Sequence, residues 1–338
     1  MKSAVILGER KAGLIEVPDP RAKEDWALVK IHYAPMCKEH KHFITGKKPA
    51  YLGHEAVGEV VEVAQPGHVK VGDRVAVMPQ YPCEKCSYCL SGEYIFCENN
   101  YNYMEFTGLP YTESTYAQYI LKPSWLLPKI PDNVSYESAS VYCCGVGISF
   151  GAFQAMNLNA FDTVLITGLG QIGIGAIINA KYRGARVIAV ESHEYRVILA
   201  KELGVDAVIH PGDENAVKKI KDLCNGIGPD CAVDCSGTVA AHRLCIDAVR
   251  RRGQVAFVGE CYEETPVRIS PDMIRKGLKL IGIWAYNLND FPDIMKVIEN
   301  SPLVSRLVTH VFPLSEIQKA FEVSATFEHS KILLKPWE

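Results

Sequence analysis

Hydrophobic and polar positions follow two different patterns along the chain, and the pattern changes near residue 146. Before that point, short apolar segments are interrupted by glycine and proline, as in proteins built from many short strands. Residues 57–63 are expected to form one such strand, and residues 71–75 a turn leading into another. This first part of the chain is therefore predicted to be a β-rich, barrel-like domain.

Beyond residue 146, short apolar runs alternate with helix-like segments such as residues 172–183 and 193–203. Buried strands joined by helical crossovers are typical of the doubly wound parallel sheet of a Rossmann fold. The predicted strands cover residues 164–167, 187–190, 207–209, 231–234, 255–258 and 280–283. We therefore predict an α/β fold with one domain from residues 1–145, a Rossmann domain from residues 146–286, and a return of residues 287–338 to the first domain.

Composition and charge narrow the class of protein. The chain has 338 residues, of which 48% are hydrophobic, and this length suits two domains. The net charge of −3 gives no general attraction to nucleic acid or anionic membranes, so neither is an expected partner. No apolar run approaches the roughly 18 residues of a membrane helix, and the N-terminus lacks a signal-peptide pattern, so we expect a cytoplasmic protein.

A glycine-rich loop follows the first predicted strand of the second domain. Gly168, Gly170 and Gly173 have the spacing of a dinucleotide-binding turn, and Gln171 and Ile172 open the helix that follows. The first glycine permits a tight turn, the second lets the backbone approach a pyrophosphate, and the third lets helix and strand pack closely. This context predicts a nicotinamide dinucleotide site.

An acidic residue at the end of the next strand indicates which dinucleotide is bound. Glu191 lies 23 positions after Gly168, near the spacing expected for a carboxylate that binds the adenosine ribose. Because a carboxylate repels a 2′-phosphate, we expect NAD rather than NADP. Arg196 is expected to flank the adenine, although in another orientation it can accept a 2′-phosphate.

Twelve cysteines occur in the chain, and four of them are clustered. Without a secretion signal, metal ligation or burial explains cysteines better than disulfides do. Cys83, Cys86, Cys89 and Cys97 have the spacing of a tetrahedral structural zinc site with no open position. Free thiols, a redox pair or an iron–sulfur cluster are the alternatives.

Other cysteine and histidine residues that could bind a metal lie far apart in the sequence, and their spacing alone does not show that they form one site. Joined with its neighbours, however, the segment 53–60 (GHEAVGEV) resembles the zinc signature of the medium-chain alcohol and polyol dehydrogenases. The four-cysteine lobe, residues 71–75, residues 114–119 and the Rossmann glycines follow in the order of that family. The resemblance covers essentially the whole chain and implies a GroES-like catalytic domain beside the Rossmann domain.

The resemblance also implies a catalytic zinc, and so two zinc ions per chain. Its expected ligands are Cys37, His54 and a third cysteine, and they leave one position for water or substrate, as in alcohol dehydrogenases. Cys144 fits the family register better than Cys143. Glu55 is the candidate for a transient ligand during exchange of water.

The segment after Cys37 departs from the family pattern. Glu39 stands where the family has a serine or threonine that relays the substrate proton, whereas His42 occupies the position of the relay histidine. We expect Glu39 to be a general base or to hydrogen-bond a hydroxyl-rich substrate; the alternative is an ion pair with Lys38 or Lys41. For His42 the alternative is a surface imidazole.

Two further positions follow from the family register. Tyr116 falls at an aromatic pocket position, and its hydroxyl suggests a polyol, cyclitol or sugar derivative as substrate. Lys331 corresponds to a basic position that contacts the cofactor pyrophosphate, with an exposed lysine as the alternative. The expected activity is hydride transfer between NAD and a secondary alcohol or ketone.

Two other functions compete with this interpretation. A zinc-independent quinone or enone reductase of the same superfamily would need none of Cys37, His54 and Cys144, and a non-catalytic NAD-binding scaffold would need only the fold. The partner is expected to be a small-molecule substrate. Because oligomers are usual in the family, a homodimer or homotetramer is expected.

Overall fold

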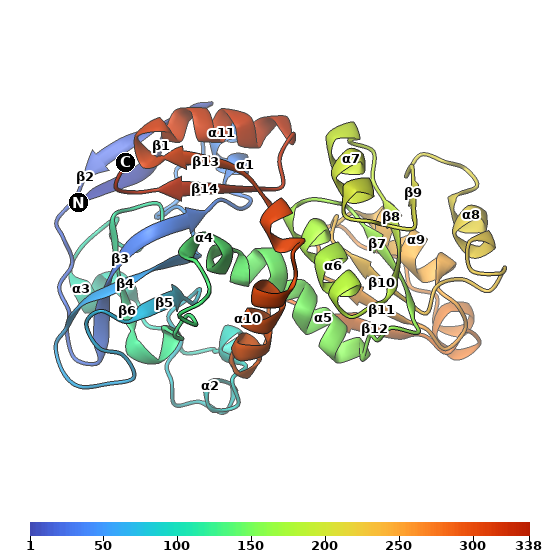
Figure 1. The fold of residues 1–338 in the computed structure, drawn as a ribbon, viewed down its shortest axis with the longest axis horizontal. Coiled ribbons are helices and arrows are strands. Elements are labelled where there is room, and N and C mark those ends of the chain that lie inside the picture. Colours follow the sequence, from blue (N-terminus) through green and yellow to red (C-terminus); the bar gives the residue numbers. More distant parts are fainter. The chain divides into compact units, whose positions relative to one another are not determined.

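The chain forms two units that are interleaved along the sequence (Figure 1). The computed structural model describes all 338 residues. The first unit comprises Met1–Cys144, Asn287–Asn300 and Val308–Glu338, and the second comprises Gly145–Tyr286 and Ser301–Leu307. Residue 145 and residues 301–307 are predicted for the first unit, but in the structure they belong with the second.

The first unit is built around a six-stranded sheet in the order β13-β14-β3-β4-β5, with β6 paired to β3, and a separate two-stranded sheet of β1 and β2. Neighbouring strands of the larger sheet are antiparallel except for the parallel pair of β13 and β14. The strands are β1 (Lys2–Gly8), β2 (Lys11–Glu16), β3 (Trp26–Pro35), β4 (Ala56–Val63), β5 (Arg74–Val77), β6 (Tyr119–Pro123), β13 (Val308–Pro313) and β14 (Lys331–Lys335).

Short helices close this unit. They are α1 (His40–Thr45), α2 (Ser87–Leu90), α3 (Tyr103–Thr107), α4 (Tyr136–Ala139), α10 (Phe291–Asn300) and α11 (Ile317–Thr326). Figure 1 shows α11 alongside β13 and β14, and Phe321 of this helix stacks on Phe43 of α1 with ring centroids 5.2 Å apart. Because β14 and α11 come from the C-terminal segment, that segment completes the core of the first unit.

The second unit contains one parallel sheet in the order β12-β11-β10-β7-β8-β9. Its strands are β7 (Thr163–Thr167), β8 (Arg186–Val190), β9 (Ala207–Ile209), β10 (Cys231–Asp234), β11 (Gln254–Phe257) and β12 (Lys279–Gly282). Each lies within one residue of its predicted position, and the order is that of a Rossmann fold. The predicted fold class is confirmed.

Helices cover both faces of this sheet, which explains why its central strands are apolar throughout. The helices are α5 (Ile148–Met156), α6 (Gln171–Tyr182), α7 (Glu194–Glu202), α8 (Ala216–Asp222) and α9 (Val239–Ala248). The helix α6 packs on α5 and on β7 and β8, whereas α8 packs on α9. The strand order reverses between β7 and β10, which is where Rossmann folds bind a dinucleotide.

The helical stretch Tyr136–Met156 changes its pitch at η4 (Cys143–Gly147), a single π-helical turn that carries Cys144. Such turns are rare and occur frequently at functional sites. By length and composition the stretch could also span a membrane, but it is 83% buried within the protein, as core helices are. It is therefore no more than weak evidence for a membrane segment.

Candidate active site

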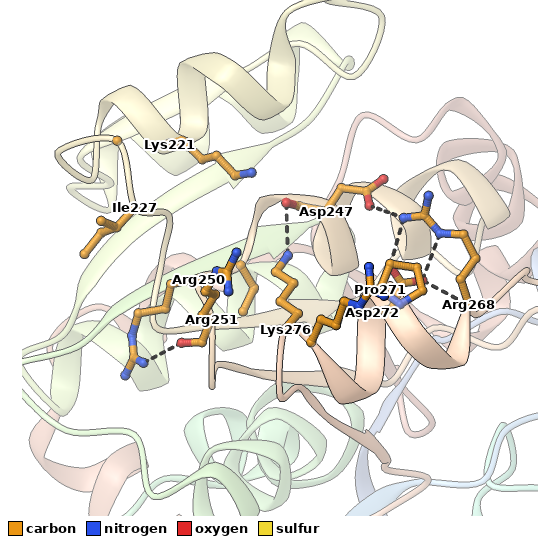
Figure 2. A pocket seen from close by; sticks show the side chains of 12 residues that line it. Lys221, Ile227, Asp247, Arg250, Arg251, Arg268, Pro271, Asp272 and Lys276 are labelled. Carbon is orange, nitrogen blue, oxygen red and sulfur yellow. Dashed lines mark hydrogen bonds and ion pairs between the residues drawn. The ribbon is translucent and has the colours of Figure 1, made fainter.

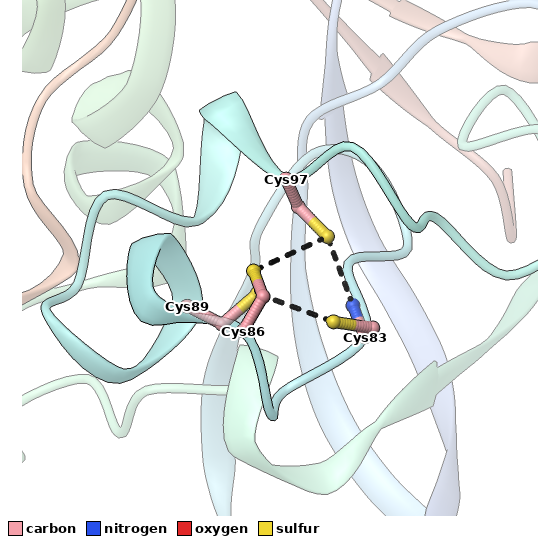
Figure 3. Close-up of side chains that lie close together, drawn as sticks. All are labelled: Cys83, Cys86, Cys89 and Cys97. Atoms are coloured by element: carbon pink, nitrogen blue, oxygen red, sulfur yellow. Dashed lines mark hydrogen bonds between the residues drawn. The ribbon is translucent and has the colours of Figure 1, made fainter.

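The four clustered cysteines form a compact sulfur site in the loop around α2 and η1 (Tyr94–Phe96), shown in Figure 3. The sulfur of Cys86 lies 3.4 Å from that of Cys89 and 3.9 Å from that of Cys97. Four ligands at about 2.3 Å around a tetrahedral zinc give sulfur separations of about 3.8 Å. The cluster therefore has the dimensions of a zinc site, whereas a disulfide would require about 2.05 Å.

The surroundings of these sulfurs favour a cation. The backbone N–H groups of Cys83 and Asn99 donate to the sulfur of Cys97 at 3.3 and 3.4 Å. Burial raises the pKa of the Cys89 and Cys97 thiols, whereas hydrogen bonds from backbone N–H groups outweigh burial at Cys83 and lower its pKa to about 7. A bound cation would stabilise all of these groups as thiolates. The donor set consequently fits a structural zinc.

A second donor group unites Cys37, His54, Glu55 and Cys144 in the first unit. Their ligand atoms all lie within 4.8 Å of one another. The Nε2 atom of His54 is 3.3 Å from the sulfur of Cys144, close to the separation of about 3.6 Å across a tetrahedral zinc. The structure brings Cys144 into this group and leaves out Cys143.

Three elements of the first unit deliver these donors. Cys37 follows the end of β3, His54 and Glu55 precede β4, and Cys144 lies in the π-helical turn. Cys144 and Glu55 are buried, whereas Cys37 and His54 are partly exposed. Two thiols and one imidazole with solvent access on one side match the ligand set of a catalytic zinc with an open position.

Glu39, the predicted general base, makes three hydrogen bonds in this site. Its Oε1 atom lies 3.1 Å from Nδ1 of His54, and its Oε2 atom accepts from the Tyr116 hydroxyl and the Cys37 N–H, both at 2.8 Å. Burial alone would raise the pKa of Glu39, but His54 and Tyr116 lower it to about 2. The alternative ion pair with Lys38 or Lys41 is not among these three contacts.

Tyr116 lies close to the donor group, and its predicted role in a substrate pocket stays a prediction. Its side chain is fully buried in the core of the first unit, and its hydroxyl is used by Glu39. The hydroxyl also accepts a hydrogen bond from the Cys37 N–H at 3.3 Å. The family register located the residue correctly near the site, but it did not show that the hydroxyl points toward a protein carboxylate.

Lys331 is fully buried and forms an ion pair with Glu55, with Nζ 2.5 Å from Oε1. Burial opposes its ammonium group, but the neighbouring carboxylate raises the pKa of Lys331 above its usual value. The other oxygen of Glu55 accepts the Cys144 N–H at 3.2 Å. The alternative of an exposed lysine is therefore excluded, and the contact with a pyrophosphate stays a prediction. No sequence signal indicated this pairing, because the partners lie far apart along the chain.

His42 lies in the last turn of α1 and is half-buried. Its side chain makes no hydrogen bond or ion pair with another protein group, so its role as a proton relay stays a prediction. The structure does not bring it into the hydrogen-bond network of Glu39, His54 and Tyr116.

The glycine-rich loop of the second unit has the shape that a dinucleotide requires. Gly168 has φ of +79°, and a Cβ atom there would lie 2.6 Å from a carbon of Ser236. A Cβ atom on Gly173 would lie 2.0 Å from the carbonyl oxygen of Gly168, whereas one on Gly170 would meet nothing within 4 Å. The open space at Gly170 and the uncapped start of α6 at Gln171 and Ile172 fit a bound pyrophosphate.

Glu191 lies just beyond the end of β8 and holds the glycine-rich loop. Its Oε2 atom accepts the Leu169 N–H at 2.7 Å, and its Oε1 atom accepts the Ser192 and His193 N–H groups at 2.7 and 3.0 Å. The guanidinium of Arg196 lies 3.9 Å from Oε2. Carboxylate oxygens have further lone pairs, so binding of ribose hydroxyls remains compatible with these contacts.

Comparisons with known proteins agree with this geometry. The family described as alcohol dehydrogenase GroES-like domain matches residues 23–132, and the family described as zinc-binding dehydrogenase matches residues 172–300. The chain is 30% identical to sorbitol dehydrogenase of Bacillus subtilis (strain 168), with 99% of this chain and 97% of that protein covered. It is 32% identical to an alcohol dehydrogenase of Geobacillus stearothermophilus, with 95% of each covered.

A solved structure gives the same result for the fold. The alcohol dehydrogenase TADH from Thermus sp. ATN1 superposes with a TM-score of 0.89 at 27% sequence identity, with 99% of each chain covered.

Proposed function

Because the chain belongs to the family of zinc-dependent medium-chain alcohol and polyol dehydrogenases, we propose that it oxidises a secondary hydroxyl of a polyol, cyclitol or sugar derivative to the ketone, and catalyses the reverse reduction. It is an oxidoreductase that acts on CH–OH donors with NAD and zinc. The convergence of Cys37, His54 and Cys144 carries the proposal, because these three ligands leave a fourth position for substrate.

The protein residues divide the work of the site. Bound zinc supplies Lewis acidity that lowers the pKa of a substrate hydroxyl or polarises a carbonyl, and bound NAD accepts the hydride. The thiolates of Cys37 and Cys144 balance the charge of a divalent cation, and the neutral imidazole of His54 completes the set. Glu55 lies within the donor group, 3.8 Å from Nε2 of His54, where a transient ligand would stand.

We propose that Glu39 positions His54 instead of removing a proton from the substrate. A histidine that ligates a metal usually donates its other ring N–H to a carboxylate, which fixes the tautomer and the direction of the ring. Glu39 makes that contact with Nδ1 and directs Nε2 toward Cys144. Tyr116 and the Cys37 N–H hold the same carboxylate in place.

The substrate class rests on the relatives more than on the pocket. The sequence suggested a polar pocket from Glu39 and Tyr116, but these side chains hydrogen-bond each other. Support for a polyol therefore comes from the similarity to sorbitol dehydrogenase over the whole chain.

A substrate panel tests this proposal. Diols, cyclitols, sugars and simple alcohols are incubated with NAD, and the absorbance of the reduced cofactor is followed. We expect kcat/KM to be highest for a polyhydroxylated substrate, and NADP in place of NAD to support little turnover. A higher kcat/KM for simple alcohols would contradict the substrate class, and efficient use of NADP would contradict the role of Glu191.

Metal content separates the competing functions. A zinc-dependent dehydrogenase with both donor groups filled contains two zinc ions per chain, a zinc-independent reductase none or one, and a scaffold only the four-cysteine ion.

We propose further that the enzyme is a cytoplasmic homodimer or homotetramer that acts on a small molecule. Light scattering of the purified protein measures the oligomeric state.

A further inference from the structure

A cavity of about 780 Å³ lies in the second unit. Figure 2 shows the side chains that line it. It is lined by the end of α8, the end of α9, and the segments that lead into β10, β11 and β12. Segments that lead into parallel strands lie at the amino-terminal edge of the sheet. The glycine-rich loop follows β7 and lies at the carboxyl edge, so the cavity is separate from the predicted cofactor site.

The lining of this cavity is strongly cationic. Its basic residues are Lys221, Arg250, Arg251, Arg268, Arg275 and Lys276, and its only acidic residues are Asp247 and Asp272. Six cationic side chains against two carboxylates leave a formal excess of four positive charges in a protein whose net charge is −3. The basic character is therefore a local property and does not reflect the composition of the chain.

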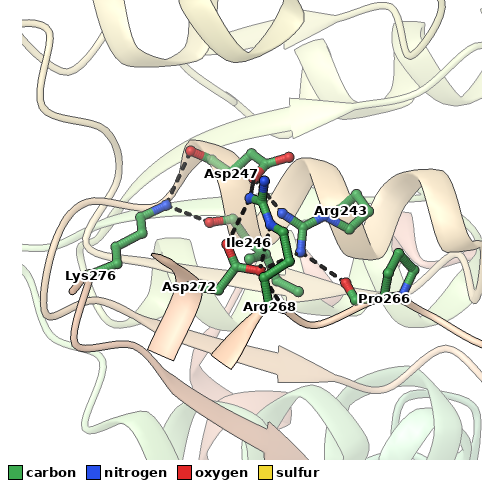
Figure 4. Close-up of polar contacts among 7 residues, drawn as sticks. All are labelled: Arg243, Ile246, Asp247, Pro266, Arg268, Asp272 and Lys276. Atoms are coloured by element: carbon green, nitrogen blue, oxygen red, sulfur yellow. Dashed lines mark hydrogen bonds and ion pairs between the residues drawn. The ribbon is translucent and has the colours of Figure 1, made fainter. Parts of the chain in front are cut away.

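The two carboxylates of the cavity are already neutralised, as Figure 4 shows. Asp272 accepts from Arg243 and Arg268, each at 2.8 Å. Asp247 accepts from the same two arginines, at 2.5 Å from Arg243 and 3.4 Å from Arg268. Both carboxylates of the lining are therefore already in ion pairs with Arg243 and Arg268, and the other cationic side chains of the lining form no ion pair with them.

The other cations of the lining have few acidic partners. Arg250 pairs with Asp230 at 2.7 Å, outside the cavity lining. Lys276 donates only to backbone carbonyl oxygens, those of Ile246 and Asp247. The side chains of Lys221, Arg251 and Arg275 make no ion pair.

Lys221, Arg251, Arg275 and Lys276 therefore add four cationic side chains to the lining, none of them in an ion pair, and Asp247 and Asp272 act on Lys276 only at longer range. Burial, together with the nearby charge of Lys221, lowers the pKa of Lys276 to about 8. Such crowding of like charges has an electrostatic cost that a bound anion would relieve.

We propose that this cavity binds a small polyanion that carries phosphate groups. Arginine presents a planar fork of N–H donors that matches phosphate oxygens, and lysine supplies a compact charge that binds phosphate well. The volume lies within the range of small-molecule sites, about 300–1,000 Å³. The concave shape and the negative charge of the whole chain favour a small ligand over a nucleic acid.

Inorganic pyrophosphate tests the site in the NAD-saturated enzyme, so that the glycine-rich loop is occupied. Isothermal titration calorimetry compares the wild type with the double variant Arg251→Gln, Arg275→Gln. Both positions are exposed and make no ion pair, so the variant is expected to fold. The double variant Lys201→Gln, Lys279→Gln removes two exposed charges of the same unit that lie outside the cavity and serves as the matched control.

We expect the wild type and the control to bind pyrophosphate with equal affinity that falls as salt rises, and the cavity variant to bind at least about tenfold more weakly. Absence of binding at millimolar pyrophosphate, or equal loss in both double variants, would overturn the proposal. Tight binding of a DNA or RNA duplex in place of pyrophosphate, or a change of oligomeric state with unchanged pyrophosphate affinity, would overturn it in favour of a nucleic-acid or subunit interface.

Discussion

Glu39 joins the groups on which the catalytic donor set depends, since its two oxygens contact His54, Tyr116 and the backbone of Cys37. In Glu39→Gln the amide keeps the shape of the side chain but loses the charge. We expect zinc affinity at the catalytic site to fall about 10- to 100-fold, as for other second-layer partners of metal-bound histidine. Competition with a chelator measures this loss independently of activity.

Tyr116→Phe is the matched control, because it removes one donor to the carboxylate and leaves the contact with His54. Its effect on zinc affinity should be smaller than that of Glu39→Gln. If Glu39 is instead the general base, Glu39→Gln will keep its full zinc content and lose one limb of the pH–rate profile. That result would refute the positioning role.

Lys122 of β6 is a buried cation that Glu113 stabilises only at longer range. Its side chain is 3% exposed and makes no ion pair, and its ammonium nitrogen lies 3.6 Å from the centre of the Tyr81 ring. Burial lowers the pKa of Lys122 to about 7. Because the folded pKa is below the unfolded value of about 10.4, the unfolded state binds more protons between these values, and this group makes stability rise with pH there.

We therefore expect Lys122→Met to stabilise the enzyme at pH 6 by roughly 1–3 kcal/mol, and the gain over the wild type to shrink at pH 9. Urea unfolding of both proteins at the two pH values checks the sign. A gain that grows toward pH 9, or a loss of stability at pH 6, would show that the contact with Tyr81 outweighs the cost of burial.

At the scale of secondary structure, two glycines in the turn from β7 into α6 are needed for different reasons. Gly173 is required for packing of the fold, and Gly170 for the approach of the cofactor. A Cβ atom on Gly173 collides with the Gly168 carbonyl, so Gly173→Ala should destabilise the protein by roughly 1–3 kcal/mol. Gly170 has φ of −65°, which alanine tolerates, and open space around its Cβ position. Gly170→Ala should therefore keep stability and weaken NAD about tenfold, or about 1.4 kcal/mol.

Thermal unfolding and fluorescence titration with NAD distinguish the two variants. Equal stability of both would mean that the loop relaxes around the Gly173 methyl group. Unchanged NAD affinity in Gly170→Ala would mean that the pyrophosphate does not approach the loop at this position.

The sequence predicted the strands and the metal site that are determined by residues close together along the chain. The strands β7 to β12 were found within one residue, because continuous apolar runs between helical patterns mark buried parallel strands. The four-cysteine lobe could be read from spacing alone, since all its ligands lie on one loop. By contrast, Cys37, His54 and Cys144 could be united only by the family resemblance, because the fold brings them together from three separate elements.

The directions in which buried polar side chains point could not be predicted from the sequence. The Tyr116 hydroxyl donates to Glu39 and the Lys331 ammonium pairs with Glu55, and neither contact was predicted. The order of residues along the chain does not show which distant residue a polar side chain will contact in the folded protein. The cationic cavity was missed for the same reason, since its residues come from several separate segments.

On the scale of the whole molecule, the metal donors and the cofactor loop belong to different units. Both cysteine-containing donor groups lie in the first unit, whereas the glycine-rich loop and Glu191 lie in the second. Each kind of ligand can therefore be held by residues of a single unit. Because the two zinc sites and the NAD site use different residues, we expect them to be separable by mutation.

Cys97→Ser and Cys144→Ser test that separation by removing one sulfur ligand from each donor group. Each variant should retain one of the two zinc ions. Cys97→Ser should lose thermal stability, because a closed four-sulfur site contributes its binding free energy to folding. Cys144→Ser should lose turnover while keeping most of its stability. NAD affinity should be unchanged in both, because no cofactor residue is altered. Metal analysis, calorimetric unfolding and NAD titration together decide the outcome, and loss of both zinc ions from either variant would show that the two sites depend on each other.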